Sequence, residues 1–187
     1  MNNWEFTPLQ DCSIEVIDGD RGKNYPKQED FFNKGFCLFL TTKNVREDGF
    51  DFSDCQFISE RKDRTLRKGK LKRGDIVLTT RGTLGNIGFY DDAVDFQHIR
   101  INSGMVIFRC SKDEFDNSFL FLFLKSDVFK GQVKSLQSGS AQPQLPIRDI
   151  KGILIPRLAL TQQREISAAL SCLDRKISNL HQQNETL

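Results

Sequence analysis

The final 27 residues of the chain contain neither Gly nor Pro, and this stretch constrains the fold more than any other feature of the sequence. From Thr161, which we expect to cap a helix, apolar residues recur at alternating steps of four and three. The expected seam comprises the heptad d positions Ile166, Leu173, Leu180 and Leu187 and the a positions Leu170, Ile177 and Asn184. A narrow seam with one polar residue at an a position is typical of helices that pair. The alternative is an amphipathic helix that lies on its own domain.

We therefore expect residues 158–187 to form a long coiled-coil-forming helix that serves as a spacer or dimerisation arm. The segment lacks a stop signal for a helix, so we expect the arm to be truncated and to continue in a longer parent protein. Its partner is either a second copy of this chain or the second half of that parent chain.

Residues 1–157 have a different pattern, in which short apolar runs alternate with Gly, Pro and polar segments. Runs of β-branched and aromatic residues predict strands at 36–41, 50–58, 76–80, 86–90, 104–109 and 152–155. Residues 117–136 predict one helix, because apolar residues continue at helical spacing and Asp116 or Asn117 can cap it. Several strands with few helices predict a mixed α+β globular domain over residues 1–157.

Composition indicates a soluble, folded protein but does not identify a partner. A hydrophobic content of 38%, including 16 Phe, is sufficient for a core, and the net charge of +2 favours no class of partner. The five Cys include no C-x-x-C pair, which is typical of reduced thiols in a cytosolic protein. There is no signal-peptide pattern and no apolar run long enough to cross a bilayer, so we expect a cytoplasmic protein with no membrane partner.

Sequence motifs for catalysis are sparse. The sequence has no phosphate-binding glycine loop, no nucleophile elbow and no His-Glu-x-x-His motif, and its two His leave no spacing for a metal site. We therefore expect no catalytic residue, metal or cofactor in this chain. Glu60 and Lys62 have the acid-x-Lys form of metal-dependent nucleases, which leaves a stand-alone nuclease as one alternative. A helical scaffold, in which only the C-terminal helix matters, is the other.

Clustered cations and polar loops favour a nucleic-acid partner. Between Glu60 and Arg73, eight basic residues accompany two acids. Lys and Arg placed on phosphates release condensed counterions, although such a run can also be a solvated face. Polar loops at 20–26, 79–83 and 138–144 add Arg, Asn and Gln, which can pair with base edges. The predicted DNA-binding residues are Arg21, Lys23, Asn24, Tyr25, Arg61, Lys62, Lys70, Arg81, Thr83, Ser140, Gln142 and Gln144, of which Arg81, Gln142 and Gln144 are expected to contact bases.

Several of these segments occur in a characteristic order along the chain. They are residues 19–26, 58–60, 71–85, 139–145 and 153–156, followed by 163–166 and the heptad helix. This ordered series resembles the target-recognition domain and first conserved helical region of type I restriction-modification specificity subunits. One departure is Thr161-Gln162-Gln163, where that family usually has Glu-Gln before the helix.

The resemblance implies a non-catalytic subunit whose recognition domain reads one half of a split site in double-stranded DNA. It also implies that the helical region docks methyltransferase (modification) subunits and that a restriction subunit joins the assembly. S-adenosylmethionine and ATP are then expected on those partner subunits only. A complete family member has two domains and two helical regions, so we expect a fragment or a half-subunit. The family also implies antiparallel helix pairing, with Asn184 facing a residue such as Gln163.

Overall fold

The computed structural model describes residues 4–137 and 143–185, except for the side chains of residues 174–175 and 177–185. The fold is mixed α+β, with several short strands and few helices, as predicted. The strands are β1 (Glu5–Pro8), β2 (Ile14–Asp18), β3 (Cys37–Leu40), β4 (Val45–Arg46), β5 (Gly49–Phe50), β6 (Phe57–Ile58), β7 (Ile76–Thr79), β8 (Ile87–Phe89), β9 (Ile99–Ile101), β10 (Met105–Cys110) and β11 (Leu154–Arg157). The helices are α1 (Glu60–Thr65), α2 (Asn117–Lys125), α3 (Asp127–Leu136), α4 (Ile147–Ile150) and α5 (Leu160–Glu185), with 3-10 turns η1 (Leu9–Asp11), η2 (Gln28–Asp30) and η3 (Thr42–Asn44).

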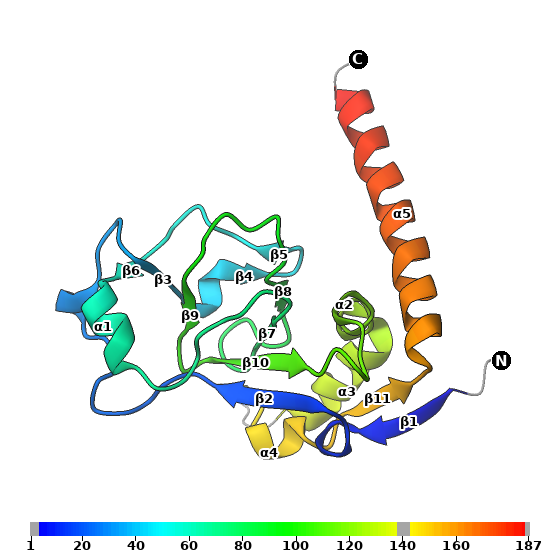
Figure 1. The fold of residues 1–187 in the computed structure, drawn as a ribbon, viewed down its shortest axis with the longest axis horizontal. Helices are drawn as coiled ribbons and strands as arrows, with labels where there is room; N and C mark the ends of the chain where they lie inside the picture. Colours follow the sequence, from blue (N-terminus) through cyan, green and yellow to red (C-terminus); the bar gives the residue numbers. More distant parts are fainter. Residues whose placement is uncertain (1–3, 138–142, 186–187) are drawn as a thin grey trace.

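An antiparallel sheet with the strand order β2-β10-β7-β8 forms the centre of the body (Figure 1). All four residues of β7 are buried, and successive side chains of a strand point to opposite faces. Ile76 and Leu78 belong to the core that α2 and α3 cover, whereas Val77 belongs to a core shared with a second sheet. Strand β7 is therefore covered on both faces, which explains why its sequence is apolar without alternation.

The second sheet has the strand order β6-β3-β9, and its strands β3 and β9 are parallel. Strand β3 is also apolar throughout, for the same reason. Leu38 and Leu40 face the core shared with β7, while Cys37 and Phe39 face a smaller cluster that contains Leu66. Two short ribbons, β4–β5 and β1–β11, complete the strand pairings.

The structure corrects three of the predicted elements. Residues 117–136 form two helices rather than one, because Ser126 is extended and its side chain caps α3 by accepting the Phe129 N–H at 3.4 Å. The predicted strand at 50–58 is two short strands, β5 and β6, which belong to different sheets. Strand β11 does not end before Pro156, which lies opposite Phe6 in the two-stranded ribbon.

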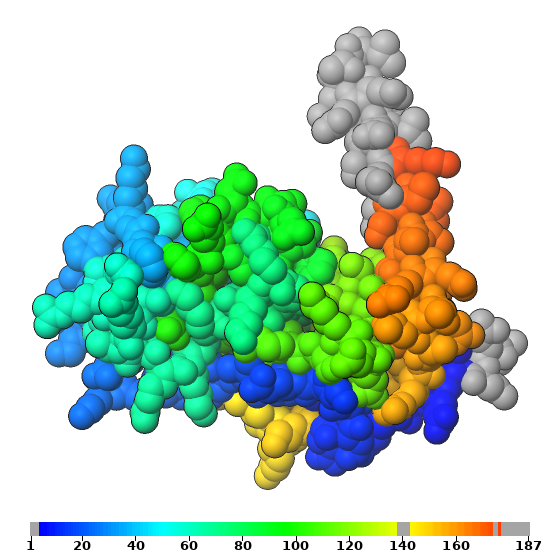
Figure 2. Space-filling model, viewed as in Figure 1, coloured from blue at the N-terminus to red at the C-terminus, as the bar shows by residue number. Residues whose placement is uncertain are grey.

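The predicted C-terminal helix is present as α5, which begins at Leu160 rather than after a cap at Thr161. The side-chain oxygen of Gln162 accepts the Ala159 N–H at 3.2 Å, and this contact caps the start of the helix instead. The first turns of α5 pack against α2 (Figure 2), and the backbone of the helix then extends away from the body (Figure 1). Within the described residues, no helix is both long and apolar enough to span a membrane.

Gln163 ties the base of α5 to the body. The residue is only 1% exposed, and its amide oxygen accepts the Asp116 N–H at 2.9 Å. Its amide nitrogen donates to the carbonyl oxygens of Glu114 and Leu158, both at 2.9 Å. Because Gln163 is buried in these contacts, it cannot face Asn184 of a second helix, and that prediction was wrong.

Candidate nucleic-acid interface

Several strands end beside one another at one edge of the body. β2 ends at Asp18 opposite Val106, and β7 ends at Thr79 opposite Met105, so both strands end beside the start of β10. β9 and its parallel partner β3 end at the same place, because residues 102–104 connect β9 directly to β10. The loops that follow these strands lie together, and we call them the strand-end edge: residues 19–25, 41–44, 80–86 and 102–104.

Arg81 and Gln144, which were predicted to contact bases from separate loops, meet at the strand-end edge. The two residues form an isolated antiparallel bridge, and the Leu145 N–H donates to Thr80 O at 3.0 Å beside them. Arg81 is exposed and Gln144 is half-buried. A guanidinium and a side-chain amide are the groups that pair bidentately with guanine and adenine, respectively. The fold thus brings together two residues that are distant in the sequence and whose side chains can form hydrogen bonds with base edges. Ser140 and Gln142 lie outside the described residues.

Other loops of the strand-end edge are joined through residues 102–104. Arg21 donates to the carbonyl oxygen of Ser103 at 3.1 Å, and the Thr83 hydroxyl donates to Thr42 O at 3.3 Å. A Cβ at Gly104 would lie 2.9 Å from the Thr42 side chain, so a larger residue there would require that side chain to shift. Arg21 and Thr83, both predicted DNA contacts, therefore belong to one surface with Arg81.

Three other predicted DNA contacts lie in the loop after β2, and two of them make contacts within the protein. The Asn24 side chain donates to Thr65 O at 3.2 Å, which ties the loop to the end of α1. Tyr25 packs edge-on against Phe39, with ring centroids 5.8 Å apart. Lys23 is exposed beside these two anchored residues. Asn24 and Tyr25 are therefore engaged within the protein, and Lys23 is the open position of the three.

Three predicted phosphate contacts belong to α1 or follow it. Arg61 is exposed, whereas Lys62 forms an ion pair with Asp30 at 2.8 Å. Lys70 forms an ion pair with Asp63, also at 2.8 Å. These two ion pairs partly neutralise Lys62 and Lys70, which the sequence analysis assigned to DNA contacts.

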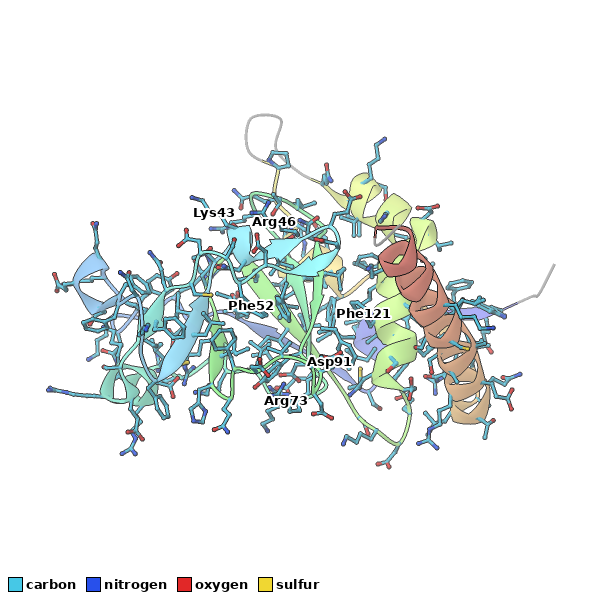
Figure 3. The ribbon with its side chains drawn as sticks, turned by 90° about the horizontal axis from the view of Figure 1, so that it is seen from above. Lys43, Arg46, Phe52, Arg73, Asp91 and Phe121 are labelled. Carbon is cyan, nitrogen blue, oxygen red and sulfur yellow. The ribbon has the colours of Figure 1, made fainter. Side chains whose placement is uncertain are left out.

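The basic stretch from residue 61 to residue 73 does not form one continuous surface. Arg73 precedes β7, at the end of that strand remote from the strand-end edge. Its guanidinium lies over the ring of Tyr90, 4.2 Å from the centroid, and donates to the carbonyl oxygen of Asp91. Figure 3 shows Arg73 and Asp91 on the side of the molecule opposite Lys43 and Arg46.

Arg100, which the sequence analysis did not select, organises the backbone around α1. Its side chain contacts the Asp63 carboxylate at 2.6 Å and donates to the carbonyl oxygens of Asp63, Leu66 and Lys68 at 2.9, 3.1 and 2.7 Å. Burial alone would raise the pKa of Asp63, but hydrogen bonds from Lys70 and Arg100 hold it below its ordinary value. A single Arg inside an apolar strand is the sequence signal that identifies such a buried cation.

Glu60 and Lys62 do not assemble the metal site of a nuclease. Residues two positions apart on a helix point to different faces, and here Glu60 pairs with Arg64 at 2.6 Å while Lys62 pairs with Asp30. Throughout the part of the chain that the structure describes, no three His, Cys, Asp or Glu side chains are placed to hold a metal ion. The nuclease alternative therefore has no structural support.

A family model described as "Type I restriction modification DNA specificity domain" matches residues 1–187. The chain belongs to this family. The specificity subunit of the type I restriction enzyme MjaVIII from Methanocaldococcus jannaschii is 29% identical over 190 residues. That match covers 99% of this chain and 43% of the relative.

Solved structures of type I restriction-modification proteins have the same fold as this specificity domain. A chain from a study of complex assembly and conformational transition of the type I R-M system superposes with a TM-score of 0.71 at 17% identity, covering 100% of this chain and 42% of that one. The HsdS subunit from Thermoanaerobacter tengcongensis superposes with a TM-score of 0.67 at 18% identity, covering 97% and 40%. At these identities the likeness shows the fold alone. The chain spans about two fifths of the length of these three proteins.

The specificity domain has three further cations on or beside the strand-end edge. Lys43 is exposed on η3, and Arg67 and Lys68 are exposed in the turn after α1. In the sequence, Arg67 and Lys68 are two members of a longer basic run, and nothing local distinguishes them from their neighbours. Only the contact between that turn and the loop after β2 places them beside Arg21.

Proposed function

We propose that this chain reads one half of a bipartite target in double-stranded DNA, as the recognition part of a type I restriction-modification specificity subunit. The observation that carries the proposal is the strand-end edge, where Arg81 and Gln144 lie side by side in a chain that the DNA specificity model matches throughout. Polar side chains in loops on a rigid sheet are suited to contact base edges in the major groove.

In this proposal residues 1–157 are the target-recognition domain and residues 158–187 are a spacer arm. The arm positions methyltransferase (modification) subunits and the restriction subunit on cytoplasmic DNA. The chain itself contributes no catalytic group and no cofactor, and S-adenosylmethionine and ATP bind to those partners. A stand-alone nuclease would need a metal site, which the described residues do not form, and an inert scaffold does not account for the polar groups gathered at the strand-end edge.

The proposed contacts follow from exposure and position. Arg81 and Gln144 contact bases. Gln142 as a base contact and Ser140 as a DNA contact stay predictions from the sequence, because both lie outside the described residues. Arg21, Lys23 and Arg61 contact phosphates, because each is an exposed cation on the loop after β2 or on α1. Asn24, Tyr25, Lys62 and Lys70 support these loops from within, and Thr83 holds the loop after β7 against Thr42.

The test is the DNA methylation pattern of the host strain with this locus intact, deleted, or carrying Arg81→Ala with Gln144→Ala. We expect one bipartite methylated motif to disappear on deletion. The double variant should abolish or relax recognition in one half of that motif and leave the other half unchanged. A methylation pattern that is identical in all three strains would refute the proposed function.

We further propose that α5 pairs with another helix along Ile166, Leu170, Leu173, Ile177, Leu180, Asn184 and Leu187, as a coiled coil. The described part of this seam supports the proposal, because Leu170 and Leu173 are 40% and 54% exposed on a helix whose backbone extends away from the body. Apolar side chains repeated on one exposed face of a helix are typical of a pairing surface.

Replacing Leu170 and Leu173 with Asp should abolish self-association of the full chain, or its binding to methyltransferase subunits, as measured by sedimentation velocity. Ala168→Asp is the matched control, because Ala168 is exposed on the same helix but outside the seam. If the double variant sediments and binds its partners like the unmodified chain, the seam is not a pairing surface.

A further inference from the structure

A hollow of about 510 Å³ opens between the loop after β2 and the turn after α1. Residues 18–22 form one wall, and Arg67 and Lys68 form the other. We call it the loop pocket. It adjoins the strand-end edge, because Arg21 in its wall also donates to Ser103 O at 3.1 Å.

Asp20 closes the loop that forms the first wall. The residue is 7% exposed, and its carboxylate accepts the N–H groups of Gly22 at 2.8 Å and Arg67 at 2.7 Å. Burial would raise the pKa of Asp20, but these backbone hydrogen bonds and the nearby Arg67 charge hold it below its ordinary value. The negative charge of Asp20 is therefore directed at backbone amides inside the wall, and it joins two segments that are far apart in the sequence.

Glycine allows the two walls to approach. A Cβ at Gly19 would lie 2.1 Å from the carbonyl oxygen of Asn102, so no other residue fits there without a shift of the backbone. Gly69 has a positive φ of 80°, and a Cβ there would lie 3.3 Å from the Gly19 Cα. The pocket is thus a consequence of close backbone packing at two glycines rather than of side-chain flexibility.

Arg100 anchors the second wall by donating to the carbonyl oxygens of Leu66 and Lys68. With these carbonyls fixed, the Arg67 guanidinium extends across the loop, 3.3 Å from where a Cβ of Gly22 would lie. The turn that carries Arg67 and Lys68 is therefore anchored on both sides, by Arg100 and by Asp20.

The charges around the loop pocket suit a singly charged anion. Arg21, Arg67 and Lys68 supply three positive charges and Asp18 and Asp20 two negative ones, so the lining has a net charge of +1. Asp18 pairs with Arg21 at 3.2 Å, which leaves Arg67 and Lys68 as the more open pair. Guanidinium and ammonium groups donate several hydrogen bonds to phosphate oxygens, and such contacts fix the register of a protein on DNA.

We propose that the loop pocket holds one backbone phosphate of the bound DNA and so sets the register of Arg81 on the base pairs. This inference rests on the proposed function, and it names a contact that Lys70 does not make, because Lys70 is paired with Asp63. A DNA phosphate fits better than a free phosphate ion, since the pocket opens onto the same surface as the residues that are suited to read bases.

The test compares the full chain with the double variant Arg67→Ala, Lys68→Ala on a labelled duplex of random sequence. Binding is measured by fluorescence anisotropy between about 50 and 200 mM salt. Loss of one phosphate contact should make the slope of log K against log salt shallower by about 0.9. The matched control is Lys112→Ala, Arg164→Ala, which removes one Lys and one Arg from a hollow elsewhere on the body and should leave the slope unchanged.

The outcomes separate this inference from the proposed function. A slope that is the same in the double variant and the unmodified chain overturns the loop pocket and leaves DNA recognition intact. A chain that binds no DNA overturns both. Calorimetry with inorganic phosphate alone supplies the other arm: saturable binding that the double variant loses, with an unchanged DNA slope, would assign the pocket to a free anion.

Asp20→Asn tests whether the hydrogen bonds from Gly22 and Arg67 to the Asp20 carboxylate are needed for the loop pocket to bind phosphate. The substitution adds one unit of net positive charge, so a purely electrostatic effect would tighten DNA binding. We expect weaker binding instead, with a shallower salt slope like that of the double variant, because the wall loses a charged acceptor for two backbone N–H groups. Tighter binding by a variant with an unchanged thermal midpoint would show that Asp20 does not position the pocket.

Discussion

Strand β7 has an arginine near each end, and the two side chains have different surroundings. Arg73 precedes the strand and lies over the Tyr90 ring, where it donates to Asp91 O. Arg81 follows the strand and is exposed at the strand-end edge beside Gln144. The two residues are eight positions apart in the sequence, at opposite ends of the four-residue strand β7.

The contrast extends to the groups around each arginine. Beside Arg73, the carboxylate of Asp75 is 2% exposed and forms two hydrogen bonds with Arg109, at 2.9 and 2.7 Å. Beside Arg81, the neighbouring loops present exposed or half-buried polar side chains. Arg73 is therefore held in contacts within the fold, whereas Arg81 is exposed to solvent. Density of charge in the sequence does not distinguish these roles.

The largest expected effect is at the Arg73 end. Asp75→Ala should lower the free energy of unfolding by about 3 kcal/mol, because it leaves the Arg109 guanidinium without its buried counter-charge. Urea denaturation followed by circular dichroism measures the change. Asp92→Ala, an exposed acid at the same end, should change stability by less than about 0.5 kcal/mol. A small effect of Asp75→Ala would remove the distinction between a structural end and a recognition end.

The next effect is at the Arg81 end and concerns binding rather than stability. Arg81→Ala should cost about 1–3 kcal/mol on the cognate duplex, once the methylation pattern has identified it, and little on random DNA. The free energy of unfolding should stay within about 0.5 kcal/mol of the unmodified value, because Arg81 is exposed. If the substitution unfolds the domain, Arg81 is structural and the comparison fails.

The smallest effect is expected for Arg73→Ala. Removing the cation over Tyr90 should destabilise the domain by roughly 0.5–1 kcal/mol, measured by the same denaturation experiment. DNA affinity and its salt dependence should not change, since Arg73 faces away from the strand-end edge. An affinity loss as large as that of Arg81→Ala would place both ends of β7 on DNA.

The elements that the sequence predicted well are those with a strong local pattern. Strands β3, β7, β8 and β10 are apolar runs bounded by turn residues, and α2 begins after the predicted Asp116 cap, whose carboxylate accepts the Phe119 N–H at 2.9 Å. Strands β1, β2, β4 and β9 and helices α1 and α4 were missed. They are short, and β1, β2 and β9 pair with strands that are distant in the sequence, so tertiary pairing rather than local propensity decides their conformation.

The candidate site was predictable in its parts but not in its arrangement. Arg81 and Gln144 were selected as polar residues in loops, yet only the strand pairing places them side by side. Lys62 and Lys70 also form ion pairs within the protein, with Asp30 of η2 and with Asp63 from within the basic stretch itself. Such pairings depend on the tertiary fold and leave no signal in the sequence.

Because Gln163 fixes the base of α5, a small change of angle there produces a large displacement at the far end of the helix. Helix α5 has 26 residues, which at about 1.5 Å each make it roughly 39 Å long. A tilt of about 5° at its base moves the far end by roughly 3.4 Å, which is about one base-pair step of DNA. The hydrogen bonds of Gln163 with Asp116 and Glu114 therefore help to determine where the far end of α5 lies relative to the body.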